Sequence, residues 1–468
     1  MKRQFRHYNM DQEYLLPPNL RDWLPEKHLA MFISDVVEAL DLSAIFSSYT
    51  GKAGNSRGYA PYHPGMMAKL IVYGYCTGTA SSRKIEAATY GDVAFRVLAG
   101  DQHPDHSIIS EFRRRHLKEL AALFLQVLML CEKAGLVKLG HVALDGTKVK
   151  ANASKHKAMS YDRMVQTEER LKKEVASLLE VAEKVDSAED AMHGKGQRGD
   201  DLPAELARRN SRLKKIGEAK AALEAEAEEK ARQAAEEAEA KREQRATKEA
   251  ETGRKTPGPQ PKAPPDPALV KPEAKAQRNF TDPDSRIMMD GATKAFEQAY
   301  NAQAAVDSEH QIIVAAAITQ EANDKNQLIS MLEKVKENTG RLPQSATADA
   351  GYFSEDNVNA GALKEVDLYV PPDRQKHGRA QAPVNDQAPG AQSTANKMRT
   401  KLNTETGTKI YAKRKQIVEP VFGQTKEARG FRRFSFRGLA KVSDEWILIC
   451  LTHNLLKLFR AGLAAAVA

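Results

Sequence analysis

The sequence predicts an α/β domain built on a mixed sheet flanked by helices, with an all-α N-terminal domain and a long helical insertion. Three observations predict this architecture. Apolar residues recur at helical spacing through much of residues 1–135. Residues 157–275 carry heptad-spaced apolar side chains among many charges. Short apolar runs typical of strands lie on both sides of that insertion, in residues 136–156 and 276–468.

The composition narrows the class of protein. The 468 residues are 41% hydrophobic and 28% charged, which allows two or three domains with much solvated surface. The formal net charge is +9, which favours a polyanionic partner. The three cysteines, Cys76, Cys131 and Cys450, lie in or beside apolar runs without a CxxC spacing, as is typical of buried thiols in a reducing compartment. No signal peptide or membrane-length apolar run is present, so we expect a soluble intracellular protein.

The N-terminal domain contains one candidate phosphate-binding helix. Helices are expected at residues 24–40, 64–75 and 117–134, with serines that can cap another helix near Ser81. In residues 104–116, Asp105 or Ser107 can cap a helix that presents Arg113, Arg114 and Arg115. Such a helix either contacts phosphate or is an ordinary charged surface helix, and the basic chain favours contact with DNA.

Residues 139–153 contain the first candidate acid. Residues 142–144 are expected to form a buried strand, Asp145-Gly a turn, and residues 147–151 a return strand. An aspartate at the end of a buried strand is costly unless it is paired or binds a metal. From this segment alone, a simple hairpin turn is the favoured interpretation.

The insertion is expected to be an antiparallel coiled-coil hairpin. Its heptad positions are Leu171, Val175, Leu178, Ala182 and Val185, then, after a Gly-rich break, Leu206, Leu213, Ile216 and Leu223. From residue 222 to 250 the apolar residues are nearly all alanine, and a Pro-rich linker predicted to be disordered follows. We interpret this block as an insertion without chemistry of its own.

The C-terminal part predicts strands and helices in alternation. We expect a strand hairpin at 300–319, a helix at 324–339 ended by Gly340, and a short strand ending near Asp349. A helix near residue 354, a strand at 366–370, a loop at 373–400 and a buried C-terminal helix complete the list.

Residues 411–434 hold one carboxylate, Glu419, among many lysines and arginines. In a continuous helix, Glu419, Lys426 and Arg433 share one face, since they are seven residues apart. This face is either a metal ligand beside a polyanion or a solvated basic helix with one salt bridge. The stretch alone does not decide between them, but the two upstream aspartates favour the metal ligand.

The order of these elements is that of an RNase H-like domain, in which strand ends and one helix bring three carboxylates together. Asp145, Asp349 and Glu419 would repel one another unless divalent cations were bound. Hard oxygen ligands select Mg²⁺ or Mn²⁺, and two such ions about 3.5–4 Å apart can support phosphoryl transfer.

Several motifs resemble those of bacterial insertion-sequence DDE transposases, in particular the group numbered eleven-eighty-two, which is related to the insertion-sequence four and five families. The matching runs are Asp145-Gly-Thr, Thr347-Ala-Asp-Ala-Gly-Tyr, Val418-Glu-Pro-Val-Phe-Gly-Gln-Thr-Lys, Arg429-Gly-Phe-Arg-Arg, His63-Pro-Gly-Met-Met-Ala-Lys-Leu, Pro104-Asp-His-Ser-Ile-Ile, Thr281-Asp-Pro-Asp-Ser-Arg and Tyr300-Asn-Ala-Gln-Ala-Ala-Val-Asp. The resemblance spans nearly the whole chain except the alanine-rich and Pro-rich part of the insertion.

The resemblance implies site residues. It makes Asp145, Asp349 and Glu419 the catalytic and metal-binding acids, with two Mg²⁺ or Mn²⁺ ions. In the family signature, Tyr, Arg, Glu and Lys occur in that order. Tyr411, Arg414, Glu419 and Lys426 match it, although one extra residue separates Arg414 from Glu419 and leaves either Arg414 or Lys415 to contact phosphate.

We expect further DNA contacts from Arg433 and from Arg113, Arg114 and Arg115. Pro420 predicts that Glu419 lies near a helix start or a kink. The runner-up acids are Asp307, Asp356 and Glu427.

The implied function is transposition of DNA. The enzyme would cut phosphodiester bonds at terminal inverted repeats and join the freed 3′-hydroxyl to double-stranded target DNA. It would act as at least a homodimer in a synaptic complex, in the cytoplasm and associated with the nucleoid. Two alternatives stay open: an RNase H-like nuclease without strand transfer, and a non-catalytic DNA-binding relic.

Overall fold

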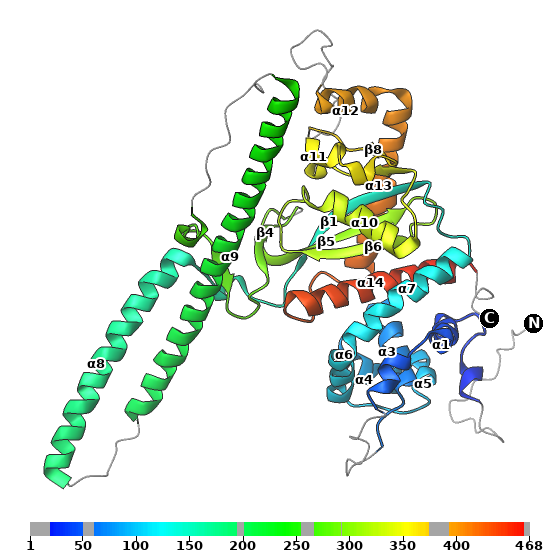
Figure 1. Ribbon diagram of the computed structural model, residues 1–468. Helices are drawn as coiled ribbons and strands as arrows, with labels where there is room; N and C mark the ends of the chain where they lie inside the picture. Colours follow the sequence, from blue (N-terminus) through cyan, green and yellow to red (C-terminus); the bar gives the residue numbers. More distant parts are fainter. Residues whose placement is uncertain are drawn as a thin grey trace, which may run out of the picture. The chain divides into compact units, whose positions relative to one another are not determined.

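The computed structural model describes residues 19–49, 60–193, 201–253, 266–291, 293–373 and 393–462. The chain forms two compact units. One unit comprises Met1–Val149 and Tyr300–Ala468, and the other comprises Lys150–Ala299. The predicted mixed α/β architecture with a helical N-terminal region is confirmed (Figure 1).

The N-terminal region is entirely helical in its described part. Its elements are η1 (Leu20–Trp23), α1 (Leu29–Ala39), α2 (Ser43–Ser47), α3 (Pro64–Thr77), α4 (Ser82–Gly91), α5 (Val93–Leu98), α6 (His106–Arg115) and α7 (Leu117–Lys133). Helix α3 starts on Pro64, where a missing N–H costs nothing, and ends at Gly78 in the left-handed conformation. Asp105 caps α6 as predicted, since the Ser107 N–H donates to its Oδ1 at 2.7 Å.

The sheet is mixed in strand direction. Its order is β4-β5-β1-β7-β8, and β6 also pairs with β5. The strands are β1 (His141–Lys150), β4 (Arg286–Met289), β5 (Phe296–Asp307), β6 (Ile313–Thr319), β7 (Ser345–Thr347) and β8 (Asp367–Tyr369). Strands β5 and β6 form the predicted antiparallel hairpin, whereas β1, β7 and β8 are parallel neighbours. The parallel arrangement brings the carboxyl ends of β1 and β7 to the same edge.

Strand β1 differs from the prediction. Residues 141–150 form one continuous strand, so Asp145 and Gly146 are not a turn between two strands. An Asp-Gly hairpin turn needs a backbone with positive φ, and Gly146 does not have one. The hairpin interpretation of Asp145-Gly was therefore wrong, and Asp145 lies within a strand.

Helices α10 (Gln327–Thr339) and α14 (Leu439–Arg460) both pack on β6 (Figure 1). The predicted end of α10 at Gly340 is confirmed, with φ of 74°. The predicted buried C-terminal helix is confirmed as α14. The Asn454 side chain of α14 makes two hydrogen bonds with the Ile313 backbone. Its Oδ1 accepts from the Ile313 N–H, and its Nδ2 donates to the Ile313 C=O, each at 2.9 Å. This pairing satisfies a fully buried amide and fixes α14 against the strand.

The segment before α14 corrects two expectations. The expected loop at 373–400 ends earlier, because α12 (Thr394–Asn403) begins there; residues 374–392 lie outside the described part. Helix α13 spans Glu405–Gly423, continues as a π-turn over Gln424–Ala428, and then stops. The three residues expected on one helix face therefore do not share a helix, because Lys426 lies in the π-turn and Arg433 lies beyond it.

Pro420 lies inside α13, three residues before its last residue, so the helix start that it suggested for Glu419 is wrong, whereas the alternative of a kink stays a prediction. Proline cannot donate to the carbonyl four residues earlier. The Gln311 side chain fills that role, since its Nε2 donates to the Gln416 carbonyl at 2.9 Å. The helix thus tolerates an interior proline through a contact from the β5–β6 turn.

The second unit contains two long helices, α8 (Tyr161–His193) and α9 (Asp201–Thr252). Earlier residues of α8 contact later residues of α9. Glu174 contacts Arg209 at 3.0 Å, Glu168 contacts Lys220 at 2.9 Å, and Tyr161 contacts Glu224 at 2.7 Å. The two helices are therefore antiparallel, as predicted for the insertion.

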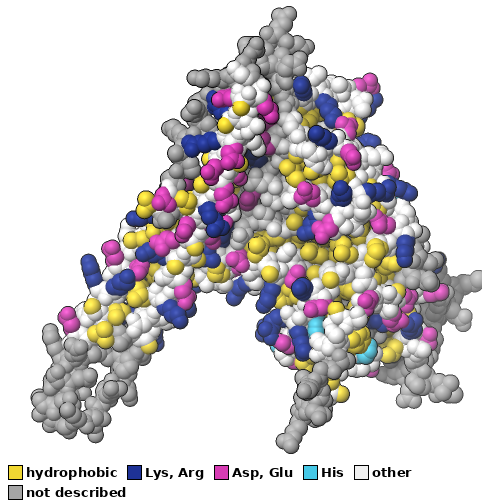
Figure 2. Space-filling view, in the orientation of Figure 1, with side chains coloured by type: hydrophobic (Ala, Val, Ile, Leu, Met, Phe, Trp, Pro, Cys, Tyr) yellow, Lys and Arg dark blue, Asp and Glu magenta, His cyan; other side chains and the backbone are white. Residues whose placement is uncertain are grey.

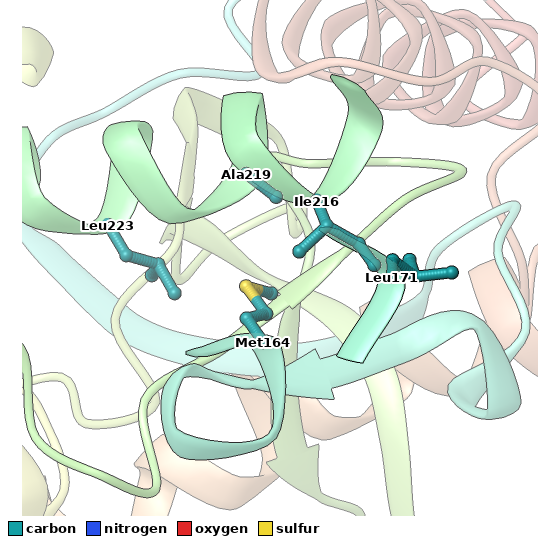
Figure 3. Close-up of a cluster of buried hydrophobic side chains, with 5 residues drawn as sticks. All are labelled: Met164, Leu171, Ile216, Ala219 and Leu223. Carbon is teal, nitrogen blue, oxygen red and sulfur yellow. The ribbon is translucent and has the colours of Figure 1, made fainter. Parts of the chain in front are cut away.

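The apolar contact between α8 and α9 follows part of the predicted heptad pattern. Met164 and Leu171 of α8 meet Ile216, Ala219 and Leu223 of α9 in a buried cluster (Figure 3). The side chains of Ala182, Val185 and Leu206 lie outside the described residues. Acidic and basic side chains are interspersed on the hairpin surface (Figure 2), which suits solvated helices.

The insertion leaves and returns through a two-stranded sheet. Strand β2 (Ala158–Ser160) pairs antiparallel with β3 (Gln277–Asn279), and Ser160 lies opposite Gln277. None of the helices in the described ranges is long and apolar enough to span a lipid bilayer.

Candidate active site

Asp145 lies on β1, and Asp349 follows directly after the end of the neighbouring parallel strand β7. The register of β1 and β7 places Ala143 opposite Thr347, and each aspartate follows two residues later. Asp349 caps the 3₁₀ turn η5 (Ala350–Tyr352), where its Oδ1 accepts from the Gly351 N–H at 2.8 Å. The parallel register thus brings two predicted acids to one edge of the sheet.

The Asp145 carboxylate is mostly buried, with 19% of its side chain exposed. Its Oδ2 accepts from Arg414 Nη1 at 3.0 Å, and its Oδ1 accepts from the Gly146 N–H at 2.8 Å. Burial raises the pKa of Asp145 to about 6; Arg414 opposes this, and the charges of Asp349 and Asp324 add to it. The three aspartates therefore lie close enough to repel one another.

Asp324 is an acid near Asp145 that the sequence interpretation missed. It lies between β6 and α10, and only 16% of its side chain is exposed. Its Oδ1 accepts from Asn301 Nδ2 at 2.6 Å and from Gln303 Nε2 at 2.7 Å. Lys148 Nζ lies 3.9 Å from the same oxygen.

A sequence signal for this network existed. Asn301 and Gln303 alternate on β5 among apolar residues, so both side chains are on one face of a strand that is buried throughout this region. Two buried amides on one face need polar partners, and a nearby acid is a natural partner.

Gly146 leaves room for this network. A Cβ at that position would lie 2.3 Å from Gln303 Nε2 and 2.7 Å from Asp324 Oδ1, closer than van der Waals contact allows. Tyr352 holds the other end of Gln303 by donating its hydroxyl hydrogen to Oε1. Burial raises the pKa of Tyr352 well above 10, and the three aspartates raise it further, so the hydroxyl stays protonated.

Helix α13 presents Tyr411 and Arg414 to this edge. The Arg414 guanidinium lies 5.8 Å from the centre of the Tyr411 ring and pairs with Asp145. Burial raises the pKa of Tyr411, and Arg414 opposes the rise. Lys415, by contrast, is exposed. Of the two candidate cations, Arg414 is the one that reaches the aspartates in this structure.

Glu419 is exposed on α13. Within the described residues, no hydrogen bond or ion pair joins its carboxylate to another side chain. The structure therefore brings Asp145 and Asp349 together but gives no contact that joins Glu419 to them. Its role as third acid stays a prediction.

The other predicted cations of this region differ in exposure. Lys426 Nζ donates to the Lys148 carbonyl at 2.6 Å, which places it beside β1. Arg433 is exposed. Both stay predictions as DNA-contacting residues.

Each runner-up acid has a local explanation. Asp307 is buried at the β5–β6 turn, where its Oδ2 accepts from the Leu139 N–H at 2.7 Å. Asp356 is exposed in the first turn of α11 (Glu355–Val358). Glu427 pairs with Arg432 on the surface. These contacts agree with a turn residue and two solvated carboxylates.

The three arginines of α6 are not equivalent. Arg113 is only 7% exposed, and its Nη1 donates to the Ala80 carbonyl at 2.5 Å. A guanidinium buried in this way cannot contact a DNA backbone, so the expectation for Arg113 was wrong. Arg114 and Arg115 are exposed. Arg114 pairs with Glu111 at 2.5 Å, and the Arg115 guanidinium lies over the Tyr49 ring. They stay candidates for phosphate contact.

Carboxylates are suitable donors for a hard cation such as Mg²⁺, and Asp145, Asp324 and Asp349 supply three of them. Their oxygens do not gather as closely as the ligands of one ion. In the described ranges, the one triad of acidic or histidine ligand atoms within 4.8 Å of one another is Glu86, Asp105 and His106, at the start of α6.

Two family models match this chain. Residues 18–115 match a transposase domain, DUF772, and residues 373–459 match a transposase DDE domain. No curated protein and no solved structure matches. The two matches indicate a DDE transposase, a class that acts in DNA transposition and recombination. The second match includes Tyr411, Arg414 and Glu419, whereas Asp145 and Asp349 lie outside both.

Proposed function

We propose that this chain is an insertion-sequence transposase that cuts DNA at terminal inverted repeats and transfers the freed strand to a target. Two observations together carry the proposal: the two transposase domain matches, and the equivalent positions of Asp145 on β1 and Asp349 just after the parallel strand β7. The finer assignment to the group numbered eleven-eighty-two rests on the motif resemblance alone.

An RNase H-like fold is part of this proposal. It is supported by the sheet, in which an antiparallel β5–β6 hairpin lies beside β1 and is followed by the parallel strands β7 and β8. It is also supported by the position of α13, which carries Arg414 to the edge where β1 and β7 present their aspartates.

Asp145, Asp349 and Glu419 would hold the divalent cations of such an enzyme. When bound, Mg²⁺ or Mn²⁺ would activate an attacking water or 3′-hydroxyl and stabilise the leaving oxygen. Arg414 offsets the charge of Asp145 in the absence of metal and is placed to meet a phosphate once that carboxylate binds a cation. Lys426 beside β1, with the exposed Lys415 and Arg433, adds positive charge for a DNA backbone.

The N-terminal helices would bind the inverted repeats, with Arg114 and Arg115 as phosphate contacts. Synapsis of two element ends requires at least a homodimer. A measurement of the mass of the protein bound to end DNA would detect this dimer. Location in the cytoplasm at the nucleoid follows from the same function.

Cleavage of the element's end DNA by the wild type and by Glu419→Gln tests the proposal. The substitution keeps the size of the side chain but removes its charge. We expect Mg²⁺-dependent cleavage by the wild type, and loss of cleavage with retained DNA binding in the variant. Unchanged cleavage by the variant would remove Glu419 from the site.

Strand transfer separates the transposase from a nuclease of the same fold. DNA ends that are already cut should be joined to a target plasmid in the presence of Mg²⁺. Cleavage without joining would favour the RNase H-like nuclease. Binding without either activity would favour the DNA-binding relic.

A further inference from the structure

We propose that Asp324 is a third aspartate of the active site and offers its free carboxylate oxygen to a divalent cation. The inference rests on the proposed function and adds a ligand to it. It concerns a residue outside both matched domains and outside the predicted triad of acids.

The two oxygens of Asp324 have different surroundings. Oδ1 accepts from the side-chain amides of Asn301 and Gln303, at 2.6 and 2.7 Å. In the described part of the chain, no hydrogen bond reaches Oδ2. Oδ2 lies 3.6 Å from the point where a Cβ on Gly351 would be, next to the turn that Asp349 caps. The protein thus fixes one oxygen and leaves the other available beside Asp349.

A second acceptor nearby lacks a donor. Asn301 is 0% exposed, and its Oδ1 has no hydrogen-bond partner. The orientation of its amide is fixed, because Nδ2 donates to Asp324 and to the Glu321 carbonyl at 3.1 Å. A Cβ on Gly146 would lie 2.9 Å from Asn301 Oδ1 and 2.7 Å from Asp324 Oδ1, so both oxygens line the same space beside β1. A bound cation, or an ordered water molecule, would supply the partner that this buried acceptor lacks.

A purely structural role of Asp324 does not account for the negative charge of its carboxylate. An anchor for the β6–α10 connection needs only an acceptor for two amides, which a neutral side chain would supply. Here Asp324 is a further carboxylate beside that of Asp349, since a Cβ on Gly351 would lie 2.9 Å from Asp349 Oδ1 and 3.6 Å from Asp324 Oδ2, and two such neighbouring charges repel each other. Lys148 Nζ forms a long ion pair at 3.9 Å with Oδ1 of Asp324, the oxygen that the two amides already hold. Three mutually repelling carboxylates are stabilised by a cation that binds them.

Binding of Mn²⁺ in the absence of DNA tests the inference without a catalytic readout. The loss of the free Mn²⁺ signal in electron paramagnetic resonance gives the Kd for the wild type, Asp324→Asn, Asp145→Asn and the control Asp356→Asn. Asparagine at 324 can still accept from both amides, so we expect an unchanged thermal unfolding midpoint in EDTA. We expect the Kd to rise at least about tenfold in Asp324→Asn and Asp145→Asn. Asp356→Asn should leave the Kd for Mn²⁺ unchanged, because Asp356 is exposed.

The outcomes separate this inference from the proposed function. If Asp145→Asn weakens Mn²⁺ binding but Asp324→Asn leaves the Kd within twofold of the wild type, Asp324 is only a structural anchor and the inference fails. If neither substitution changes the Kd, or the wild type binds no Mn²⁺, the metal site itself fails and with it the proposed mechanism. If Asp324→Asn lowers the unfolding midpoint, the Kd values are compared at a temperature at which both proteins are fully folded: a Kd that is still raised about tenfold supports the ligand role, and an unchanged Kd overturns it.

Discussion

Gly146 is the residue on which the geometry of the candidate site depends most directly. It lies within β1, immediately after Asp145, and the tips of Gln303, Asp324 and Asn301 occupy the space that a side chain would fill. Gln303 cannot move away freely, because Tyr352 holds its oxygen and Asp324 holds its nitrogen. The absence of one methyl group therefore permits three polar side chains to meet.

Gly146→Ala should lower the free energy of unfolding by about 1–3 kcal/mol, the usual cost of overpacking a buried site. The matched control is Gly140→Ala, because Gly140 directly precedes the same strand and has no atom within 4 Å of its ideal Cβ. Urea unfolding followed by tryptophan fluorescence is suitable, since Trp446 donates from Nε1 to the Gln303 carbonyl at 3.0 Å. Equal stability of the two variants would contradict the close packing at Gly146.

At the scale of elements, α14 and β6 form the contact that supports the sheet behind the site. Asn454 pairs with the Ile313 backbone, and the adjacent His453 contacts the Gln311 carbonyl through Nε2 at 2.9 Å. His453 is fully buried, and its Nδ1 has no partner. Burial lowers the pKa of His453 to about 3, so the ring stays neutral and Nε2 carries the hydrogen.

This neutral histidine makes the fold sensitive to acid. The unfolded chain binds a proton at His453 below about pH 6.5, whereas the folded chain does so only near pH 3. The free energy of unfolding therefore decreases as the pH falls through this window, and the decrease is about 2 kcal/mol between pH 7 and pH 5. In His453→Gln, which can still donate to Gln311, that part of the pH dependence should disappear. Urea unfolding of both proteins at the two pH values measures it, and an identical loss in both would contradict a neutral buried ring.

The elements also show how far the sequence alone could lead. Helical spacing and caps predicted α3, α6, α10 and α14, because local signals such as Pro64, Asp105 and Gly340 mark their ends. The end of α13 was not predictable in this way. Its interior Pro420 is tolerated only because Gln311, more than a hundred residues away, bonds the Gln416 carbonyl.

The same distinction applies to the site. Asp145 and Asp349 were predictable because each is associated with an apolar strand, and parallel strands bring such positions together. Asp324 was not predicted, since its position depends on Asn301 and Gln303 of another strand. The sequence around Arg113 is typical of an exposed basic helix, yet the Arg113 guanidinium donates to the Ala80 carbonyl and lies over the ring of Phe436.

At the scale of the whole molecule, the chain enters α8 from β2 and returns from α9 to β3, and these two strands pair with each other. Ser160 and Gln277 are opposite residues of β2 and β3. A short turn can therefore replace residues 161–276 and connect the two strands as a hairpin. Excision would remove the apolar cluster between α8 and α9 together with both helices, and it would uncover Met159 and Phe280, which pack against that cluster.

The excised protein should keep Mg²⁺-dependent cleavage of end DNA within about threefold of the wild type, because all the candidate site residues lie outside the insertion. Circular dichroism should show the expected loss of helix with an otherwise intact cooperative transition. A folded but inactive protein would mean that the helical hairpin belongs to the active assembly.

The most direct test of the account is DNA cleavage by Asp145→Asn and Asp349→Asn, compared with Asp356→Asn. Asp145 on β1 and Asp349 just after β7 occupy equivalent positions in the parallel register, whereas Asp356 is exposed on α11. We predict that each of the first two substitutions lowers Mg²⁺-dependent cleavage at least a thousandfold, about 4 kcal/mol of activation free energy, while end-DNA binding persists. Asp356→Asn should cleave as the wild type does. Cleavage that survives in either Asp145→Asn or Asp349→Asn would contradict the central claim that these two aspartates form the active site.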